Sequence, residues 1–216
     1  MIKNRRFKLV IFDLDGTLTQ ERSIWQYIHE RLGKWHGFAE KYQEQFLAGE
    51  MTYEEFCERD AQAWRGMKVE EVWEIVKRVP YHPGVDQLIE YMKGKGLKLT
   101  MISSGLSILS DWVHQQYGFD YSVSNDLLHQ NGTLTGKVRI RVYYDKKAEW
   151  VERILERFGV KPEEVIAIGD SIGDIEMFRM VGLAIAFNSS CKDLDQVAGI
   201  CVQSQTLADI IPRLPI

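Results

Sequence analysis

The sequence predicts an α/β fold in which helices cover both faces of a parallel sheet. Short apolar runs typical of buried strands alternate with amphipathic stretches, and three of these runs end in polar residues. Strands of a parallel sheet are buried on both faces, so they are apolar throughout and are joined by helices. A long amphipathic stretch also follows the first apolar run, which indicates a helical insertion.

The first strand is predicted at residues 8–12, where the sequence is KLVIF. In the stretch that follows, apolar and aromatic residues recur at helical spacing, with charged residues between them. Pro80, Pro83 and Gly84 end this stretch. We therefore expect residues 1–20 and 81–216 to form the core, and residues 21–80 to form a helical cap inserted after the first strand.

Beyond residue 84 the pattern alternates between helix and strand. Asn131-Gly132 is a strong hairpin signal, with arms at 127–130 and 133–138. The other expected strands lie at 97–102, 121–124, 165–168, 183–187 and 200–202. The expected helices lie at 86–95, 107–116, 147–158 and 172–180, and one more ends the chain.

Composition excludes several classes of protein. The 216 residues carry a net charge of −4 and no basic run, so we expect neither nucleic acid nor an anionic membrane as a partner. No apolar stretch approaches the roughly 18–20 residues of a membrane span. Cys57, Cys191 and Cys201 lack paired spacing, which favours free thiols and a cytoplasmic protein.

Polar residues gather where three of the predicted strands end. Asp13 and Asp15 follow the first strand, a Ser-Ser-Gly sequence at 103–105 follows the second, and GDSIGD at 169–174 follows another. Ligands of open α/β sheets bind beyond the carboxyl ends of the strands. If these strands are neighbours, one crevice holds Asp13, Asp15, Ser103, Asp170 and Asp174.

So many carboxylates in one crevice require positive charge. Ionised carboxylates a few ångströms apart repel one another, and burial makes each more costly. Mg²⁺ prefers oxygen ligands and phosphates, and a lysine would help; Lys147 is the candidate and Lys146 its alternative. This set suits an aspartate nucleophile, a carboxyl group that transfers protons, and a divalent metal.

On these residues the chain resembles phosphatases of the haloacid dehalogenase (HAD) superfamily, and in particular the phosphoserine phosphatase-like branch. Four motifs of that superfamily occur in order over residues 9–187: DLDGT at 13–17, an apolar run ending in Ser103, then Lys147, then GDSIGD. The resemblance implies a Rossmann-like core and a Mg²⁺-dependent hydrolase. Its substrate would be a small phosphorylated metabolite, cleaved through an aspartyl-phosphate.

The resemblance also implies a role for each matching residue. Asp13 would be the nucleophile, Asp15 the general acid and base, and Lys147 the group that offsets negative charge. The expected metal ligands are Asp13, Asp15 through its backbone carbonyl, Asp170 and Asp174. The expected phosphate or substrate contacts are Thr17, Arg22, Ser103, Ser104, Gly105 and Lys147.

The cap is expected to select the substrate. In phosphoserine phosphatases a cap glutamate and a cap arginine recognise the amino acid. The corresponding positions here hold Arg22 and Glu58, so the charges are exchanged, although Glu21 and Arg59 lie one residue away. The aromatic residues Trp25, Tyr27 and Trp64 would either form the core of the cap or favour a larger or aromatic-compatible phosphate ester.

Several alternatives stay open at this point. The chain could be a phosphoserine phosphatase proper, a phosphomutase, or a catalytically silent phosphate-binding protein. As for partners, a small phosphate ester is expected as substrate. The chain itself is expected to be a monomer or a homodimer.

Overall fold

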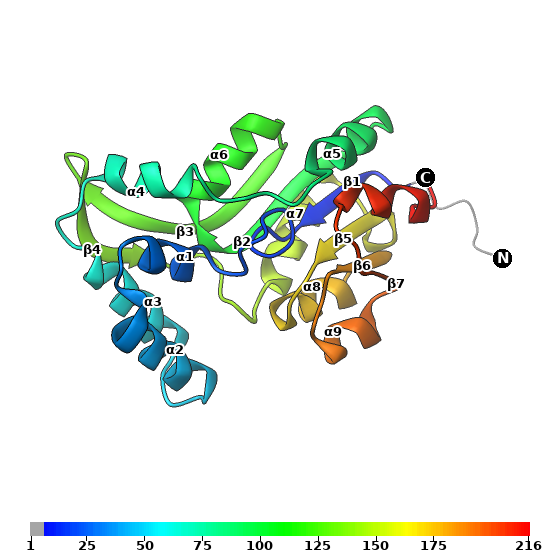
Figure 1. The fold of residues 1–216 in the computed structure, drawn as a ribbon. Coiled ribbons are helices and arrows are strands. Elements are labelled where there is room, and N and C mark those ends of the chain that lie inside the picture. The colour runs from blue at the N-terminus through cyan, green and yellow to red at the C-terminus, as the bar shows by residue number, and fades with distance from the viewer. Residues whose placement is uncertain (1–6) are drawn as a thin grey trace.

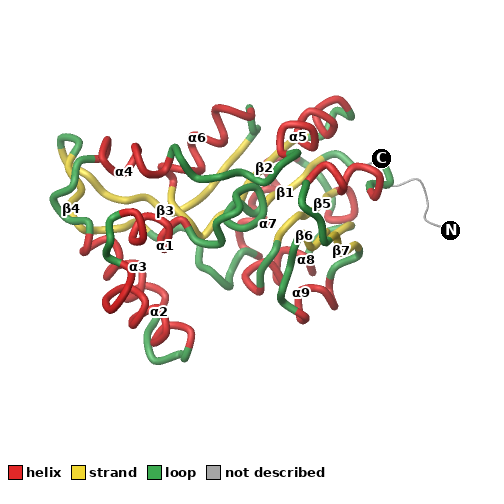
Figure 2. The backbone as a smooth tube through the Cα atoms, viewed as in Figure 1, coloured by secondary structure: helices red, strands yellow, loops and turns green. Residues whose placement is uncertain are grey.

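The computed structural model describes residues 7–216, and residues 1–6, which the sequence assigns to the core, lie outside this range. Within residues 7–216, seven strands form one sheet in the order β4-β3-β2-β1-β5-β6-β7 (Figures 1 and 2). Neighbouring strands pair in parallel, except that β3 and β4 pair antiparallel. The strands are β1 (Leu9–Phe12), β2 (Lys98–Leu106), β3 (Tyr121–Gln130), β4 (Thr133–Arg139), β5 (Val165–Gly169), β6 (Leu183–Phe187) and β7 (Ile200–Val202).

Helices cover both faces of the sheet, as the sequence predicts (Figure 1). Val10 and Phe12 of β1 belong to a hydrophobic cluster with α5, α6 and the C-terminal 3₁₀ helix, whereas Leu9 and Ile11 belong to a cluster with α7, α8 and α9. Because both faces are buried, every residue of β1 is apolar. The bounds are α5 (Val85–Gly94), α6 (Ser107–Tyr117), α7 (Ala148–Phe158), α8 (Ile175–Arg179), α9 (Lys192–Val197) and the 3₁₀ helices Pro162–Glu164, Ile172–Asp174 and Leu207–Arg213.

The inserted segment, residues 21–80, is helical and lies between β1 and α5. The Ser23 side chain caps the first helix by accepting from the Gln26 N–H, and Thr52 and Glu55 form a capping box on the third. Each cap satisfies backbone N–H groups that would otherwise lack partners. The helices are α1 (Ile24–Arg31), a kinked π turn (Trp35–Ala39), α2 (Glu40–Leu47), α3 (Tyr53–Ala63) and α4 (Val69–Val76).

The β3–β4 hairpin differs from its prediction in one respect. Asn131 and Gly132 form the turn with positive φ angles of 50° and 72°, as expected. The separate strands predicted at 121–124 and 127–130 are wrong, because β3 is continuous from Tyr121 to Gln130. The polar residues at its middle resemble a loop in sequence, but the buried Asn125 side chain makes the hydrogen bonds that such a position requires.

The hairpin also packs against the inserted segment. Lys68 and Thr133 form an isolated antiparallel bridge, and the Gly66 N–H donates to the Leu134 carbonyl at 2.9 Å. Figure 1 shows β4 reaching past the rest of the sheet towards α3 and α4. The inserted helices are therefore held to the core at the hairpin as well as through the chain connections.

Three helical details depart from the sequence prediction. The helix expected at 172–180 is a 3₁₀ turn followed by the short α8, and α9 was not expected. The last helix is 3₁₀ rather than α, and Pro212, which has no N–H to donate, lies inside it. Within residues 7–216, no helix combines the length and apolarity that crossing a bilayer requires.

Candidate active site

The centre of the sheet brings the three predicted polar segments together. Strand β1 pairs in parallel with β2 on one side and β5 on the other, with Phe12 opposite both Met101 and Ile168. Connections run in opposite directions from this point, which is where open α/β sheets bind ligands. Residues from all three strand ends line one cavity of about 340 Å³, including Asp13, Gly105 and Asp170.

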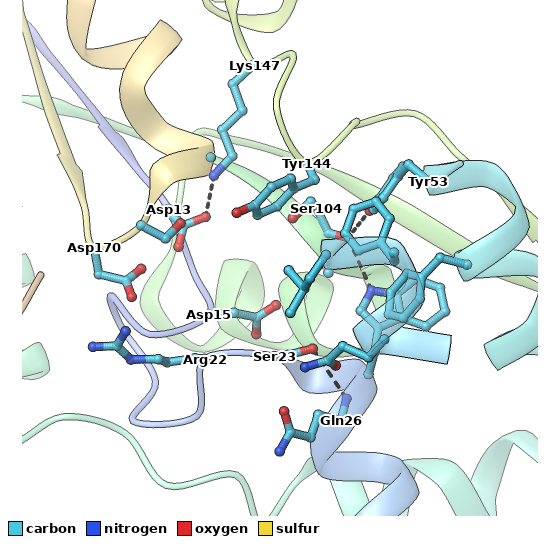
Figure 3. A pocket seen from close by; sticks show the side chains of 18 residues that line it. Asp13, Asp15, Arg22, Ser23, Gln26, Tyr53, Ser104, Tyr144, Lys147 and Asp170 are labelled. Atoms are coloured by element: carbon cyan, nitrogen blue, oxygen red, sulfur yellow. Dashed lines mark hydrogen bonds and ion pairs between the residues drawn. The ribbon is translucent and has the colours of Figure 1, made fainter. Parts of the chain in front are cut away.

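Lys147 is the cation of the cluster, and Lys146 lies elsewhere. The Lys147 ammonium donates to Asp13 Oδ1 at 2.5 Å (Figure 3). It also donates to Asp174 Oδ1 at 2.7 Å, and its side chain is only 2% exposed. Lys146 lies over the Tyr143 ring instead. Both carboxylates raise the pKa of Lys147 against the opposing effect of burial, so it stays charged.

Asp13, Asp170 and Asp174 form the carboxylate cluster, with an oxygen of each within 4.8 Å of the others. Asp174 has little capacity left to bind a metal ion, because its Oδ2 already accepts hydrogen bonds from the backbone N–H groups of Asp170 and Ser171, both at 3.1 Å. Asp13 and Asp170 are thus the carboxylates best able to offer oxygens to a cation. Hard dications prefer such ligands, so the donor set fits Mg²⁺.

The Thr17 hydroxyl lies between two of these carboxylates. It is 3.3 Å from Asp13 Oδ2 and 3.3 Å from Asp170 Oδ1, and the residue is fully buried. One hydroxyl proton can serve only one of the two at a time. Its position suits orientation of the carboxylates better than contact with a phosphate.

Asp13 and Asp15 differ in pKa although they lie two residues apart after the same strand. Burial raises the pKa of Asp13 to about 6, and Lys147 limits that rise. Burial and the Asp13 charge raise the pKa of Asp15 to about 8, and its Oδ1 has no hydrogen-bond partner among residues 7–216. At neutral pH Asp13 is therefore mainly ionised and Asp15 mainly protonated, a pairing suited to a nucleophile and an acid.

Two glycines make room for these carboxyl groups. Gly16 has a φ of 84°, and a Cβ there would lie 2.4 Å from Asp170 Oδ2. A Cβ on Gly105 would lie 2.3 Å from Asp15 Oδ2. Any other residue at either position would displace a carboxyl group of the site.

The end of β2 is tied to the inserted segment through the Ser104 carbonyl. This oxygen accepts from Trp25 Nε1 at 3.2 Å, Tyr53 Oη at 2.9 Å and Asn125 Nδ2 at 2.9 Å. Ser104 lines the cavity, whereas the buried Ser103 hydroxyl accepts from the Gly105 N–H. Sequence reasoning missed Asn125 and Tyr53; a polar residue interrupting an apolar strand was the available signal for Asn125.

The charged residues considered for substrate recognition do not meet in this cavity. Arg22 lies at its edge, exposed, and donates to Ser190 Oγ at 2.8 Å and to the Asn188 carbonyl at 3.2 Å. Glu58 and Arg59 line a separate cavity between α3 and the β3–β4 hairpin. Neither the exchanged pair nor its shifted alternative therefore spans the carboxylate cavity.

The remaining wall comes from side chains whose role sequence reasoning did not identify. They lie on α1, α2, α3 and the loop before α7: Gln26, Gln43, Phe46, Leu47, Phe56 and Tyr144. Figure 3 shows Asp13, Asp15 and Asp170 on one side of the space and Tyr53, Ser104 and Tyr144 on the other. The helical spacing of the aromatic residues does not distinguish a cavity wall from a hydrophobic core.

Comparison with known proteins places the chain in a family. A family model described as haloacid dehalogenase-like hydrolase matches residues 10–179. A phosphoserine phosphatase of Archaeoglobus fulgidus is 32% identical over 98% of this chain, which spans only 62% of that protein's length. A phosphoserine phosphatase of Methanocaldococcus jannaschii is 28% identical over 96% of this chain and 97% of its own length.

The fold comparison agrees with the sequence comparison. A solved phospho-aspartyl intermediate analogue of phosphoserine phosphatase matches with a TM-score of 0.84 at 27% identity. The match covers 97% of this chain and 99% of that one. Since the family model spans well over half of the residues, the chain belongs to the haloacid dehalogenase-like hydrolase family.

Proposed function

We propose that the protein is a Mg²⁺-dependent phosphomonoester hydrolase that forms an aspartyl-phosphate on Asp13. The observation that carries this proposal is the pairing of Asp13, which accepts a hydrogen bond from Lys147, with Asp15, whose Oδ1 is buried without a hydrogen-bond partner among residues 7–216. Burial raises the pKa of Asp13 to about 6 and that of Asp15 to about 8. The names of the relatives and the intermediate analogue among the similar structures support it. The substrate is then a small phosphate ester.

The proposed reaction proceeds in two steps. The ionised Asp13 carboxylate attacks phosphorus, and the protonated Asp15 gives its proton to the departing alcohol oxygen. Asp15, now ionised, then takes a proton from the water that hydrolyses the aspartyl-phosphate. Lys147 would offset negative charge in both steps, and Ser104 and Gly105, which line the cavity, would contact the phosphoryl group.

The proposed Mg²⁺ ligands are Asp13, Asp170 and the Asp15 backbone carbonyl. Asp174 instead positions Lys147 and the backbone of Asp170, because it accepts a hydrogen bond from each. When bound, the ion would neutralise charge on the phosphoryl oxygens. Residues 21–80 would act as the cap over a core of residues 1–20 and 81–216. The free thiols of Cys57, Cys191 and Cys201 support a cytoplasmic location.

Phosphoserine phosphatase proper is the second candidate, because the relatives carry that name. Release of inorganic phosphate from a panel of esters, with Mg²⁺ or with EDTA, tests the general proposal. Mg²⁺-dependent release is expected. Transfer to a second hydroxyl instead of water would indicate a phosphomutase, and tight phosphate binding without turnover would indicate a silent binding protein.

The pH dependence of stability tests the metal site. In EDTA, three carboxyl groups have raised pKa values in the folded state: about 6 for Asp13, about 8 for Asp15 and about 8 for Asp170. Each has a pKa of 3.8 in the unfolded chain. The folded state binds more protons, so stability falls as pH rises from about 4 to 8. Because Mg²⁺ must displace the protons of its proposed carboxylate ligands Asp13 and Asp170, we expect it to raise the melting temperature by at least about 3 °C more at pH 8 than at pH 6.

Thermal unfolding with and without Mg²⁺ at the two pH values measures this difference. Asp170→Asn serves as the control variant, because it removes one proposed ligand and its titration together. An Mg²⁺ effect of the same size at both pH values would argue against binding at these carboxylates.

A further inference from the structure

The cavity beyond the carboxylates has an aromatic and apolar wall. Phe46 is at its centre: its ring stacks on Phe56 at a centroid distance of 5.0 Å and contacts the rings of Tyr53 and Tyr144 at 5.9 and 6.0 Å. Beside it, Leu47 lines the cavity and is 69% exposed. This part of the inserted segment therefore leaves apolar surface open towards the site, which a ligand could cover.

Three hydrogen-bond donors of this wall are already engaged. Trp25 and Tyr53 both direct their donors to the Ser104 carbonyl, so the hydrogen-bond donor of each is used within the protein. The Gln26 amide donates to Glu30 at 2.8 Å. These three donors are therefore not available to a bound molecule, which meets the ring surfaces of Phe46 and Phe56 here.

Charged side chains are confined to the phosphate end and to one edge of the cavity. Among the described lining residues, the ionisable groups with formal charge are the site residues Asp13, Asp15, Asp170 and Lys147, together with Arg22 at the edge. Arg22 faces Ser190 and Asn188. An ammonium or carboxylate on the alcohol part of a substrate would lose water against the aromatic wall without gaining an ionic partner there, which is costly.

We propose that this cavity selects phosphate monoesters whose alcohol part is uncharged and carries an aromatic ring or a comparable apolar group, in preference to phosphoserine. The proposal rests on the phosphatase function proposed above and concerns the same site. Phe46 and Leu47 supply the contact surface, and the missing ionic partner acts against a zwitterionic amino acid.

Three esters of primary alcohols test the preference: benzyl phosphate, ethyl phosphate and O-phospho-L-serine. With Mg²⁺, we expect kcat/KM for benzyl phosphate to exceed that for each of the other two by about 10-fold or more, as burial of a phenyl group allows. Phosphoserine hydrolysed as well as benzyl phosphate, or benzyl and ethyl phosphate hydrolysed equally, would overturn this inference and leave the phosphatase function intact. Failure to hydrolyse any ester would instead contradict the function itself.

Two variants, each with a control, test whether residues of the cavity wall cause the substrate preference. Phe46→Ala is expected to lower the benzyl-to-ethyl ratio of kcat/KM by about 10-fold, whereas Phe38→Ala, at an exposed ring in a different cavity, should leave the ratio unchanged. Gln43→Glu adds a carboxylate to the wall and should raise the ratio of kcat/KM for phosphoserine to that for benzyl phosphate. Gln45 lies on the same helix but lines another cavity, so Gln45→Glu should leave this ratio unchanged. Unchanged ratios in folded Phe46→Ala and Gln43→Glu proteins would overturn the assignment.

Discussion

Replacing Asp13 by Asn is expected to lower kcat for every phosphate ester by roughly 10⁴-fold or more, as loss of a nucleophile does in other enzymes. The amide is a poor nucleophile, and it also removes one of the two carboxylates that Lys147 contacts. The fold should survive, because the change reduces repulsion between Asp13, Asp170 and Asp174. Steady-state phosphate release, with circular dichroism to verify folding, measures both effects.

Asp193→Asn is the matched control for that variant. Asp193 is exposed in α9, away from the carboxylate cavity, so the same chemical change should leave kcat unaltered. A folded Asp13→Asn protein with more than a tenth of the wild-type rate would contradict the nucleophile assignment. Rapid-quench experiments add a second measurement: phosphate should become attached to the wild-type protein and not to this variant.

The site residues at the strand ends could be predicted because they follow directly after apolar runs, and these runs are the strongest sequence signal for buried strands. An apolar run that ends in two aspartates leaves few structural explanations, and the parallel topology that places Asp13 beside Asp170 follows from alternating helices and strands. Sequence alone does not distinguish Lys147 from Lys146, since a lysine at a helix start is usually solvated. Its burial against Asp13 and Asp174 depends on how α7 packs, which sequence spacing does not specify.

The cavity wall could not be predicted in the same way. Phe46 follows Phe38 and Tyr42 at helical spacing, and Phe56 follows Tyr53 in the same way. This pattern is the same whether a ring faces a core or a ligand. Asn125 interrupts a strand in sequence, yet its side chain connects Tyr53, Ser104 and the loop at Val142 through hydrogen bonds. Such contacts join residues far apart in the chain, so only the three-dimensional arrangement reveals them.

Replacing Lys147 by Met is expected to cost about 3–5 kcal/mol of unfolding free energy at pH 8 in EDTA, the range found when one partner of a buried ion pair is removed. Met fills a similar volume, so lost packing accounts for little of this. The cost arises because Asp13 and Asp174 remain buried without their ammonium partner. Hydrolysis should also fall to the background level, and urea unfolding measures the change in stability.

The pH dependence of that cost separates charge from packing. Lys147 lowers the pKa of Asp13, so without it the pKa rises beyond the wild-type value of about 6 and Asp13 takes up a proton more readily. A raised carboxyl pKa destabilises the folded state increasingly as pH rises, and protonation relieves the repulsion as pH falls. The difference in unfolding free energy between wild type and Lys147→Met should therefore shrink from pH 8 to pH 5. Lys146→Met is the control: it removes a lysine that lies over the Tyr143 ring and should change the unfolding free energy little at either pH. A cost that stays constant over this range would mean that Lys147 acts through shape rather than charge.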